Sequence, residues 1–211
     1  MHSYIYNIPV MMQTLNEENC QTLTGHTFTQ ILSLSGLFGV HSPAQVFANR
    51  LECSIEENLV EIDFDSDLIA ELYVTINLDN RIIRNVSFVS TQKLKGISLH
   101  RVKAQVDAAM QFNMRHISLY AYGNFSLIEK YTGYLVWGKY GYQMCDPLNI
   151  DSFHKLMRDN SREEKQLYPL LCDAVGFNIW KYDGFSWYGQ FITTPNSDSF
   201  EILKKALDSR S

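Results

Sequence analysis

Gln92-Lys93-Leu94-Lys95-Gly96-Ile97-Ser98 is the stretch around which the rest of this sequence can be arranged. Residues 85–90 (NVSFVS), just before it, have the composition of a β-strand. After it, apolar residues recur at helical spacing, at positions 99, 102, 106, 109 and 110. Residues 113–116 end that pattern, and residues 117–122 (ISLYAY) form a second strand-like run. A strand, a tight loop, an amphipathic helix and a strand in this order predict a βαβ unit.

The loop that opens this helix combines basic residues with a glycine. The first turn of a helix has unpaired N–H groups and the positive end of the helix dipole. Gly96 allows the backbone to approach an anion closely, and Lys93 and Lys95 add positive charge. These features favour a phosphate or pyrophosphate site. The same residues also fit an ordinary βα turn with solvated lysines, because a single basic glycine turn is a weak signal.

Further strands are predicted upstream of the loop. Residues 59–64 alternate in polarity, and residues 65–67 (DSD) form a turn. Residues 68–78 have an apolar residue at every second position, which predicts a long half-buried strand. Asp79-Asn80 then turns the chain into a strand over residues 81–90. The other face of the long strand is polar and faces solvent or a substrate groove; it consists of Glu71, Tyr73, Thr75 and Asn77.

Residues 134–142, Tyr-Leu-Val-Trp-Gly-Lys-Tyr-Gly-Tyr, provide a second motif. Together with residues 93–98, it resembles the GNAT superfamily of acyl-CoA-dependent N-acyltransferases. There, a loop of the form Arg/Gln-x-x-Gly-x-Gly/Ala opens a helix, and a later segment reads roughly aromatic-Tyr-x-Lys-x-Gly-Phe. The resemblance covers about residues 59–145. It implies an α+β fold (an α/β mixed sheet) with a central, mostly antiparallel sheet flanked by helices and a C-terminal helical and hairpin extension.

The resemblance also implies how acetyl-CoA or another acyl-CoA would bind. In the family, the glycine loop binds the coenzyme A pyrophosphate, and a splayed pair of strands admits the pantetheine arm. An N–H group of the strand before the loop often polarises the thioester carbonyl. An Asn often follows the second strand, where this chain has Asn124 after a glycine; that Asn also fits an ordinary turn. The residues that match the pyrophosphate loop by position are Lys93, Leu94, Lys95, Gly96, Ile97 and Ser98, with Ser98 in place of the usual Gly or Ala.

The chain departs from the family at the general acid and base. Trp137 occupies the usual position of the acid, a tyrosine, and the resemblance leaves Tyr134 or Tyr140 as its substitute. Residues 86–90 contain no Glu, so Glu71 is the proposed base, although an exposed strand carboxylate is the alternative for that residue. The other candidates for the base are Glu61 and His100.

Composition restricts the class of protein. With 211 residues, 45% hydrophobic and 13% aromatic, the chain suits one folded domain with elaborations. A net charge of −5 argues against a broad nucleic-acid-binding surface. The sequence contains no run of eighteen apolar residues, so no membrane span is expected. Residues 1–6 lack the features of a signal peptide. A cytoplasmic location is therefore expected.

The spacing of the cysteines and histidines gives little support for a metal site or for thiol catalysis. The six histidines show no ligand spacing, so no metal is expected. Nothing in the sequence orients Cys145 toward His154 for thiol catalysis. The cysteines contain no CxxC pair and are expected to be free thiols; they are Cys20, Cys53, Cys145 and Cys172.

The chain divides into three parts of one domain. Residues 1–58 are an N-terminal strand and helix segment, residues 59–145 the GNAT-like core, and residues 146–211 a C-terminal extension packed on the core. In the first part we expect a short strand at residues 4–10, and a helix or strand at residues 27–40. A helix is also expected to start at Ser42-Pro43, run through Leu51 and end before Asn58.

The C-terminal extension is rich in expected helices. One starts near Asn149, with Asn149 or Asp151 as its cap, and another covers residues 162–175 with an interruption at Pro169. Residues 177–191 are dense in aromatics, and Asp183-Gly184 within them predicts a hairpin that packs in the core rather than stacking nucleic-acid bases. A last helix covers residues 200–207, with Ser197 or Asp198 as its cap.

Two functions remain open. The first is an N-acyltransferase that moves an acetyl group from acetyl-CoA to an amine acceptor that the sequence does not identify. The second is a catalytically inactive GNAT-like binding or assembly module, favoured by the missing standard acid and base. The expected partners are a small-molecule acyl-CoA and an amine, with no nucleic acid and no membrane; the extension is compatible with a homodimer contact.

Overall fold

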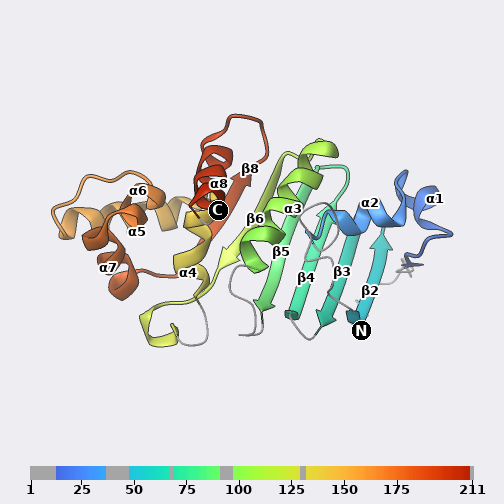
Figure 1. Ribbon diagram of the computed structural model, residues 1–211, viewed down its shortest axis with the longest axis horizontal. Helices are drawn as coiled ribbons and strands as arrows, with labels where there is room; N and C mark the ends of the chain where they lie inside the picture. Colours follow the sequence, from blue (N-terminus) through green and yellow to red (C-terminus); the bar gives the residue numbers. More distant parts are fainter. Residues whose placement is uncertain (1–12, 37–47, 67–68, 91–96, 129–131, 210–211) are drawn as a thin grey trace.

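A computed structural model describes residues 13–36, 48–66, 69–90, 97–128 and 132–209 (Figure 1). Within these residues, one mixed sheet has the strand order β1-β2-β3-β4-β5-β6-β8-β7. The strands are β1 (Gln13–Thr14), β2 (Ala48–Glu56), β3 (Leu59–Ser66), β4 (Ile69–Asn77), β5 (Ile82–Ser90), β6 (His116–Ala121), β7 (Gln143–Met144) and β8 (Trp187–Ile192).

Helices flank this sheet, which confirms the predicted α+β class. The helices are α1 (Cys20–Thr24), α2 (Phe28–Ser33), α3 (Ile97–Gln111), α4 (Gly133–Val136), α5 (Pro147–Asp159), α6 (Leu167–Cys172), α7 (Ala174–Asp183) and α8 (Asp198–Asp208), with short 3-10 turns η1 (Phe125–Leu127) and η2 (Trp137–Tyr140). Among the described residues, no helix is both long and apolar enough to span a membrane.

The predicted βαβ unit is confirmed as β5-α3-β6. Strands β5 and β6 pair in parallel, from Ile82 opposite His116 to Asn85 opposite Leu119. All the other strand pairings of the described sheet are antiparallel. Parallel neighbours need a crossover connection, and α3 supplies it.

The two faces of the sheet differ in polarity. Helices α2 and α3 lie along one face, in front of β2 to β6 (Figure 1), and the apolar side chains of that face are buried. The other face, which we call the polar face, carries a row of residues that oppose one another from β3 to β8. The strand registers place in this row Glu61, Thr75, Arg84, Ser118 and Gln190.

The helix predicted from Ser42 to beyond Leu51 is wrong where the structure describes it, because residues 48–56 form strand β2. Cys53 and Ile55 are buried at alternate positions, and that two-residue period fits a strand. Arg50, on the other face, forms ion pairs with two aspartates of β3 at 2.8 and 3.1 Å. Pairing with β3 therefore outweighs the helical spacing of the apolar residues around position 47.

Two other expectations upstream of the loop need correction or restriction. Strand β4 is confirmed, but Ala70 is exposed and Ile69 is buried, since the register with β5 shifts between Ile69 and Glu71. An extra residue in a bulge reverses the alternation there. Of the helix or strand expected at residues 27–40, the described part confirms a helix over Phe28–Ser33, where Thr27 and Gln30 form a capping box that starts α2. The strand expected at residues 4–10 lies outside the described residues.

The extension was predicted less accurately. The cap of α5 is Asp146, which accepts a hydrogen bond from the Asn149 amide at 3.0 Å, and not Asn149 or Asp151. Pro147 then occupies the first helical position, which favours this start. The helix predicted over residues 162–175 is replaced by a loop, by α6 and by the start of α7. Pro169 does not interrupt a helix, since it lies in the first turn of α6.

The hairpin predicted at Asp183-Gly184 is also wrong. Helix α7 ends at Asp183, and β8 follows and enters the sheet between β6 and β7. The indole N–H groups of Trp180 and Trp187 both donate to the Tyr134 carbonyl, at 2.9 and 3.1 Å. These bonds attach both elements to the core segment. The last helix, α8, begins after Ser197, as predicted.

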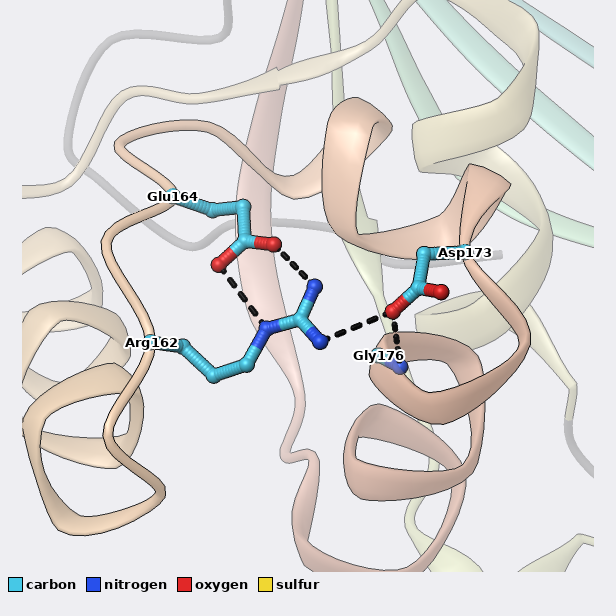
Figure 2. A network of polar contacts seen from close by, with 4 residues as sticks. All are labelled: Arg162, Glu164, Asp173 and Gly176. Atoms are coloured by element: carbon cyan, nitrogen blue, oxygen red, sulfur yellow. Dashed lines mark hydrogen bonds and ion pairs between the residues drawn. The ribbon is translucent and has the colours of Figure 1, made fainter.

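Helices α5, α6 and α7 gather beyond the β8 side of the sheet (Figure 1). Arg162, in the loop after α5, holds this group together (Figure 2). Its guanidinium forms a bidentate pair with Glu164 and a second ion pair with Asp173 at 2.8 Å. Asp173 in turn accepts a hydrogen bond from the Gly176 amide at 2.8 Å, and so caps α7.

Candidate functional site

The two parallel strands of the βαβ unit are paired over only part of their length, and we call the region beyond the last pair the cleft. Their ladder ends at Asn85 and Leu119, although β5 continues to Ser90 and β6 to Ala121. Beyond Asn85, the N–H and C=O groups of β5 that point toward β6 therefore have no β6 partner in the register. An unpaired strand edge of this kind can accept an extended ligand as an added strand.

A bulge lies at the start of the cleft. On the β4 side, Tyr73 opposes Ser87 and Val74 opposes Asn85, so Val86 is an extra residue in β5. A bulge leaves its extra residue unpaired and bends the strand locally. Val86 therefore directly follows the last residue of β5 that pairs with β6.

The first turn of α3 and the second motif meet beside this cleft. The hydroxyl oxygens of Ser98 and Tyr140 are 3.3 Å apart and share a hydrogen bond. Trp137 packs edge-on against Phe88 of β5, with the ring centroids 6.2 Å apart. Ser98, in the first turn of α3, and the second motif, residues 134–142, are therefore brought together beside the later half of β5.

Close packing fixes the second motif in this place. Gly141 has φ of 94°, and a Cβ atom there would lie 2.2 Å from the Ser199 carbonyl oxygen at the start of α8. A Cβ on Gly138 would lie 2.8 Å from a methyl carbon of Leu167 in α6. Both glycines thus let helices of the extension approach, and at Gly141, with its positive φ and a backbone atom so close, only glycine fits.

A buried polar network lies on the helix side of the cleft. Asn85 and Gln105 form a reciprocal pair of amide hydrogen bonds at 2.9 and 3.0 Å. Arg101 donates to the Asn85 side-chain oxygen at 2.6 Å, and its guanidinium lies 4.8 Å from the centre of the Phe88 ring. Asn85 also donates to the Tyr142 hydroxyl at 3.3 Å. This network joins α3, the last paired residue of β5 and the second motif.

The environment of this network disfavours charge. Arg101 is fully buried, and burial lowers its pKa to about 10. Burial also raises the pKa of Tyr142 far above its usual value, so its hydroxyl stays protonated. Among the described residues, the Nε and Nη1 groups of Arg101 have no hydrogen-bond partner. The network is therefore a rigid support whose one charge is incompletely paired.

The two candidate acids, Tyr134 and Tyr140, lie in different places in the structure. Tyr140 lies at the cleft, whereas the Tyr134 hydroxyl donates to the Lys181 carbonyl at 2.8 Å, in α7. Burial raises the pKa of Tyr134. Of the two tyrosines, Tyr140 is thus the one that the fold brings to Ser98.

The candidate bases occupy three different places. Glu71 is exposed on β4, opposite Val89 of the diverging part of β5. Glu61 lies on β3 opposite Thr75, farther along the sheet. His100 is exposed in the first turn of α3. Glu71 is therefore the candidate whose strand neighbour forms the wall of the cleft.

The candidate cofactor residues are only partly described. Lys93, Leu94, Lys95 and Gly96 lie outside the described residues. Ile97 and Ser98 begin α3, so the predicted helix start is confirmed. Asn124 is exposed, and its side-chain oxygen accepts a hydrogen bond from Ser126 at 2.6 Å, as in a local turn.

The sequence pattern did not reveal the residues beneath the cleft. Asn85, Arg101 and Gln105 are polar, and each falls on a side of its element that is otherwise apolar. One signal was available: Arg101 and Gln105 are four residues apart, directly before the core residues Val102 and Val106. Residues four apart lie on one face of a helix, here at the border of the apolar stripe, so the spacing alone does not decide between core and surface.

Chemistry other than acyl transfer finds little support in the described residues. Burial raises the pKa of Cys145, whose thiol donates to the Tyr188 carbonyl at 3.5 Å, so a thiolate nucleophile is disfavoured there. No group of three His, Cys, Asp or Glu side chains in the described ranges could hold a metal ion.

No protein-family model matches this chain, and neither a curated protein nor a solved structure matches it significantly.

Proposed function

We propose that this protein is an acyl-CoA-dependent N-acyltransferase that transfers an acetyl group to an amine. The observation that carries the proposal is the end of the β5–β6 ladder at Asn85 and Leu119, next to the first turn of α3. A thin, amide-bearing chain such as the pantetheine arm fits between two diverging strands, where it can bond to free backbone groups. The start of α3 is the place for its pyrophosphate.

The walls of the cleft suit the apolar parts of such a ligand. Val86 and Val89 on β5 are 45% and 39% exposed; Tyr120 on β6 is 43% exposed and Tyr122, just after β6, is 46% exposed. These side chains lie on both strands, at or beyond the end of the ladder. Exposed apolar groups gathered in this way are typical of ligand-binding surfaces.

Each residue then has a role set by its position. The bound acyl-CoA would supply the acyl group and a thiolate leaving group. In this proposal, backbone N–H groups at the Val86 bulge hold the carbonyl oxygen as it gains charge. Tyr140 donates a proton to the leaving sulfur, and Glu71 receives the proton of the attacking amine, directly or through water. Ser98 orients the Tyr140 hydroxyl.

The first test is calorimetric titration with acetyl-CoA. We expect a Kd in the micromolar range, about −8 kcal/mol. Ser98→Glu places a negative charge at the start of α3 and should abolish binding, because a carboxylate there repels the pyrophosphate. Gln111→Glu, at the other end of the same helix, is the matched control and should leave the Kd unchanged. Equal affinity in both variants, or no binding to the wild type, would contradict the proposal.

The second test concerns Tyr140. We expect Tyr140→Phe to bind acetyl-CoA as tightly as the wild type but to release thiol from it about a hundredfold more slowly, in the range for a lost general acid. The measurement is thiol release with a panel of primary amines. Tyr134→Phe is the control, since its hydroxyl is bonded to Lys181 and should not affect the rate directly. A rate unchanged in Tyr140→Phe would remove this residue from the mechanism.

One observation favours a second candidate, a GNAT-like binding or assembly module without catalysis. The buried polar residues in the described part of the chain include no Asp or Glu, so no desolvated carboxylate is available there as a strong base. This candidate predicts that acetyl-CoA binds and that no amine in the panel accelerates thiol release. The amine panel therefore distinguishes the two functions.

A further inference from the structure

The polar face of the sheet contains a groove of about 360 Å³. Strands β4, β5, β6 and β8 all contribute to its lining, with Thr75, Arg84 and Ser118 in a row across three of them. These residues lie in the first halves of β5 and β6, whereas the cleft lies at the ends of those strands. We call this site the Arg84 groove. Its volume is within the range of small-molecule sites, about 300–1,000 Å³.

The Arg84 groove is positively charged, although the chain has a net charge of −5. The positive charge of its lining is that of Arg84, and none of its lining residues is an Asp or Glu. Arg81 and Arg115 are adjacent, held together by a hydrogen bond of 2.7 Å from the Arg115 amide to the Arg81 carbonyl. The carboxylate of the neighbouring turn, Asp79, accepts a hydrogen bond from the Asn58 side chain at 2.8 Å. A groove with this charge attracts anions.

The groove also offers donors with suitable geometry for an oxyanion. Arg84 is exposed and has no ion pair among the described residues, so its planar guanidinium is available for two parallel hydrogen bonds. The Asn77 side-chain oxygen accepts from the Asn80 amide at 2.8 Å, which leaves its NH₂ group to donate. Burial and the charge of Arg115 lower the pKa of His116, so its ring is neutral and donates through one N–H.

One wall of the groove is aromatic. Tyr188 lines it, is 46% exposed, and packs against Tyr120 with a distance of 4.7 Å between ring centroids. An exposed, supported tyrosine ring provides a flat surface for another ring. Anion donors and such a surface within one groove favour a ligand that contains both features.

We propose that the Arg84 groove binds a small phosphorylated compound that carries a flat ring. Arg84, His116 and the Asn77 amide hold the phosphate oxygens, and the ring packs on Tyr188. The groove adjoins the cleft at Leu119 and Tyr120, but this proposal does not depend on the acyltransferase proposal.

Phenyl phosphate is the probe, since it has one ring and one phosphate and is no part of coenzyme A. We expect it to bind with a Kd of about 1 mM, followed by NMR or calorimetry. Arg84→Gln should weaken binding by about tenfold, because a charge-assisted bidentate contact is lost. Arg158→Gln, an exposed arginine of α5, is the matched control and should bind like the wild type. No binding to the wild type, or equal binding in Arg84→Gln, would overturn the proposal.

Two further variants test the parts of the ligand separately. Tyr188→Ala should reduce the affinity for phenyl phosphate to that for inorganic phosphate, and leave the latter unchanged. Glu61→Gln removes a carboxylate opposite Thr75, at the edge of the groove, and should tighten phosphate binding by about twofold. Weaker phosphate binding in Glu61→Gln would contradict an anion site.

Discussion

Two arginines of this protein are held in opposite ways. Arg101 is fully buried beneath the cleft, and its one hydrogen bond among the described residues goes to the neutral side chain of Asn85. Arg162 is 22% exposed at the junction of α5, α6 and α7, and it is paired with the carboxylates of Glu164 and Asp173 (Figure 2). Among the described residues, Arg101 is thus a buried charge without a counter-charge, whereas the half-buried Arg162 is fully paired.

The difference shows which of the two regions depends on its polar contacts. A buried charge loses its hydration, and its neutral partners return only part of that free energy. If one of these neutral partners is removed, few groups remain to stabilise the buried charge. An exposed ion pair keeps access to water, so losing one partner is a small change. The network beneath the cleft should therefore be the more sensitive of the two.

The largest effect is expected at Asn85. Asn85→Leu removes the acceptor of Arg101 and the partner of Gln105, and should lower the free energy of unfolding by about 3 kcal/mol or more. The measurement is chemical denaturation followed by circular dichroism. The double variant Asn85→Leu/Arg101→Met should recover much of that loss, because it removes the buried charge as well. A double variant less stable than Asn85→Leu would show that Arg101 stabilises the fold by itself.

These two regions also differ in how well the sequence predicts them. The βαβ unit follows from local periodicity: apolar residues every second position in the strands, and at helical spacing from Leu99 to Met110. That periodicity places the cleft but not the network beneath it. Arg101 and Gln105 are polar, and a polar residue beside an apolar stripe is equally compatible with the surface.

The extension was harder to predict because its structure depends on distant contacts. Residues 177–191 are aromatic throughout, and aromatic density does not distinguish a helix from a strand. Contacts with a distant segment supply the missing information: the Tyr134 carbonyl accepts hydrogen bonds from Trp180 in the helix and Trp187 in the strand. Likewise, β8 pairs with β6, about seventy residues earlier in the chain. No local pattern contains that information.

A smaller effect is expected at Asp173, which both pairs with Arg162 and caps α7. Asp173→Asn keeps a good capping residue and removes the ion pair, whereas Asp173→Ala removes both. We expect Tm to fall in the order wild type, Asn, Ala, and each decrease to be smaller than that of Asn85→Leu. Equal Tm values for the Asn and Ala variants would mean that the cap contributes nothing.

The smallest effect on stability is expected from a change in pH. Pairing with Arg162 lowers the pKa of Glu164, and the hydrogen bond from the Gly176 amide, followed by Arg162, lowers that of Asp173. The unfolded chain, with carboxyl pKa values of about 4, then binds more protons than the folded protein at moderately acidic pH. The stabilisation is therefore present above about pH 4 and is lost as the pH falls through the lower, folded-state values.

This loss can be measured against a variant that lacks both charges. The difference in Tm between the wild type and Glu164→Gln/Asp173→Asn should be largest near neutral pH and should disappear as the pH falls toward about 2. Glu163→Gln, an exposed neighbour, is the control and should follow the wild type throughout. Because no described carboxylate pairs with Arg101, Asn85→Leu should instead remain separated from the wild type by the same amount from neutral pH down to about 2. If the difference in Tm between Asn85→Leu and the wild type also disappeared at low pH, the buried arginine would depend on a carboxylate.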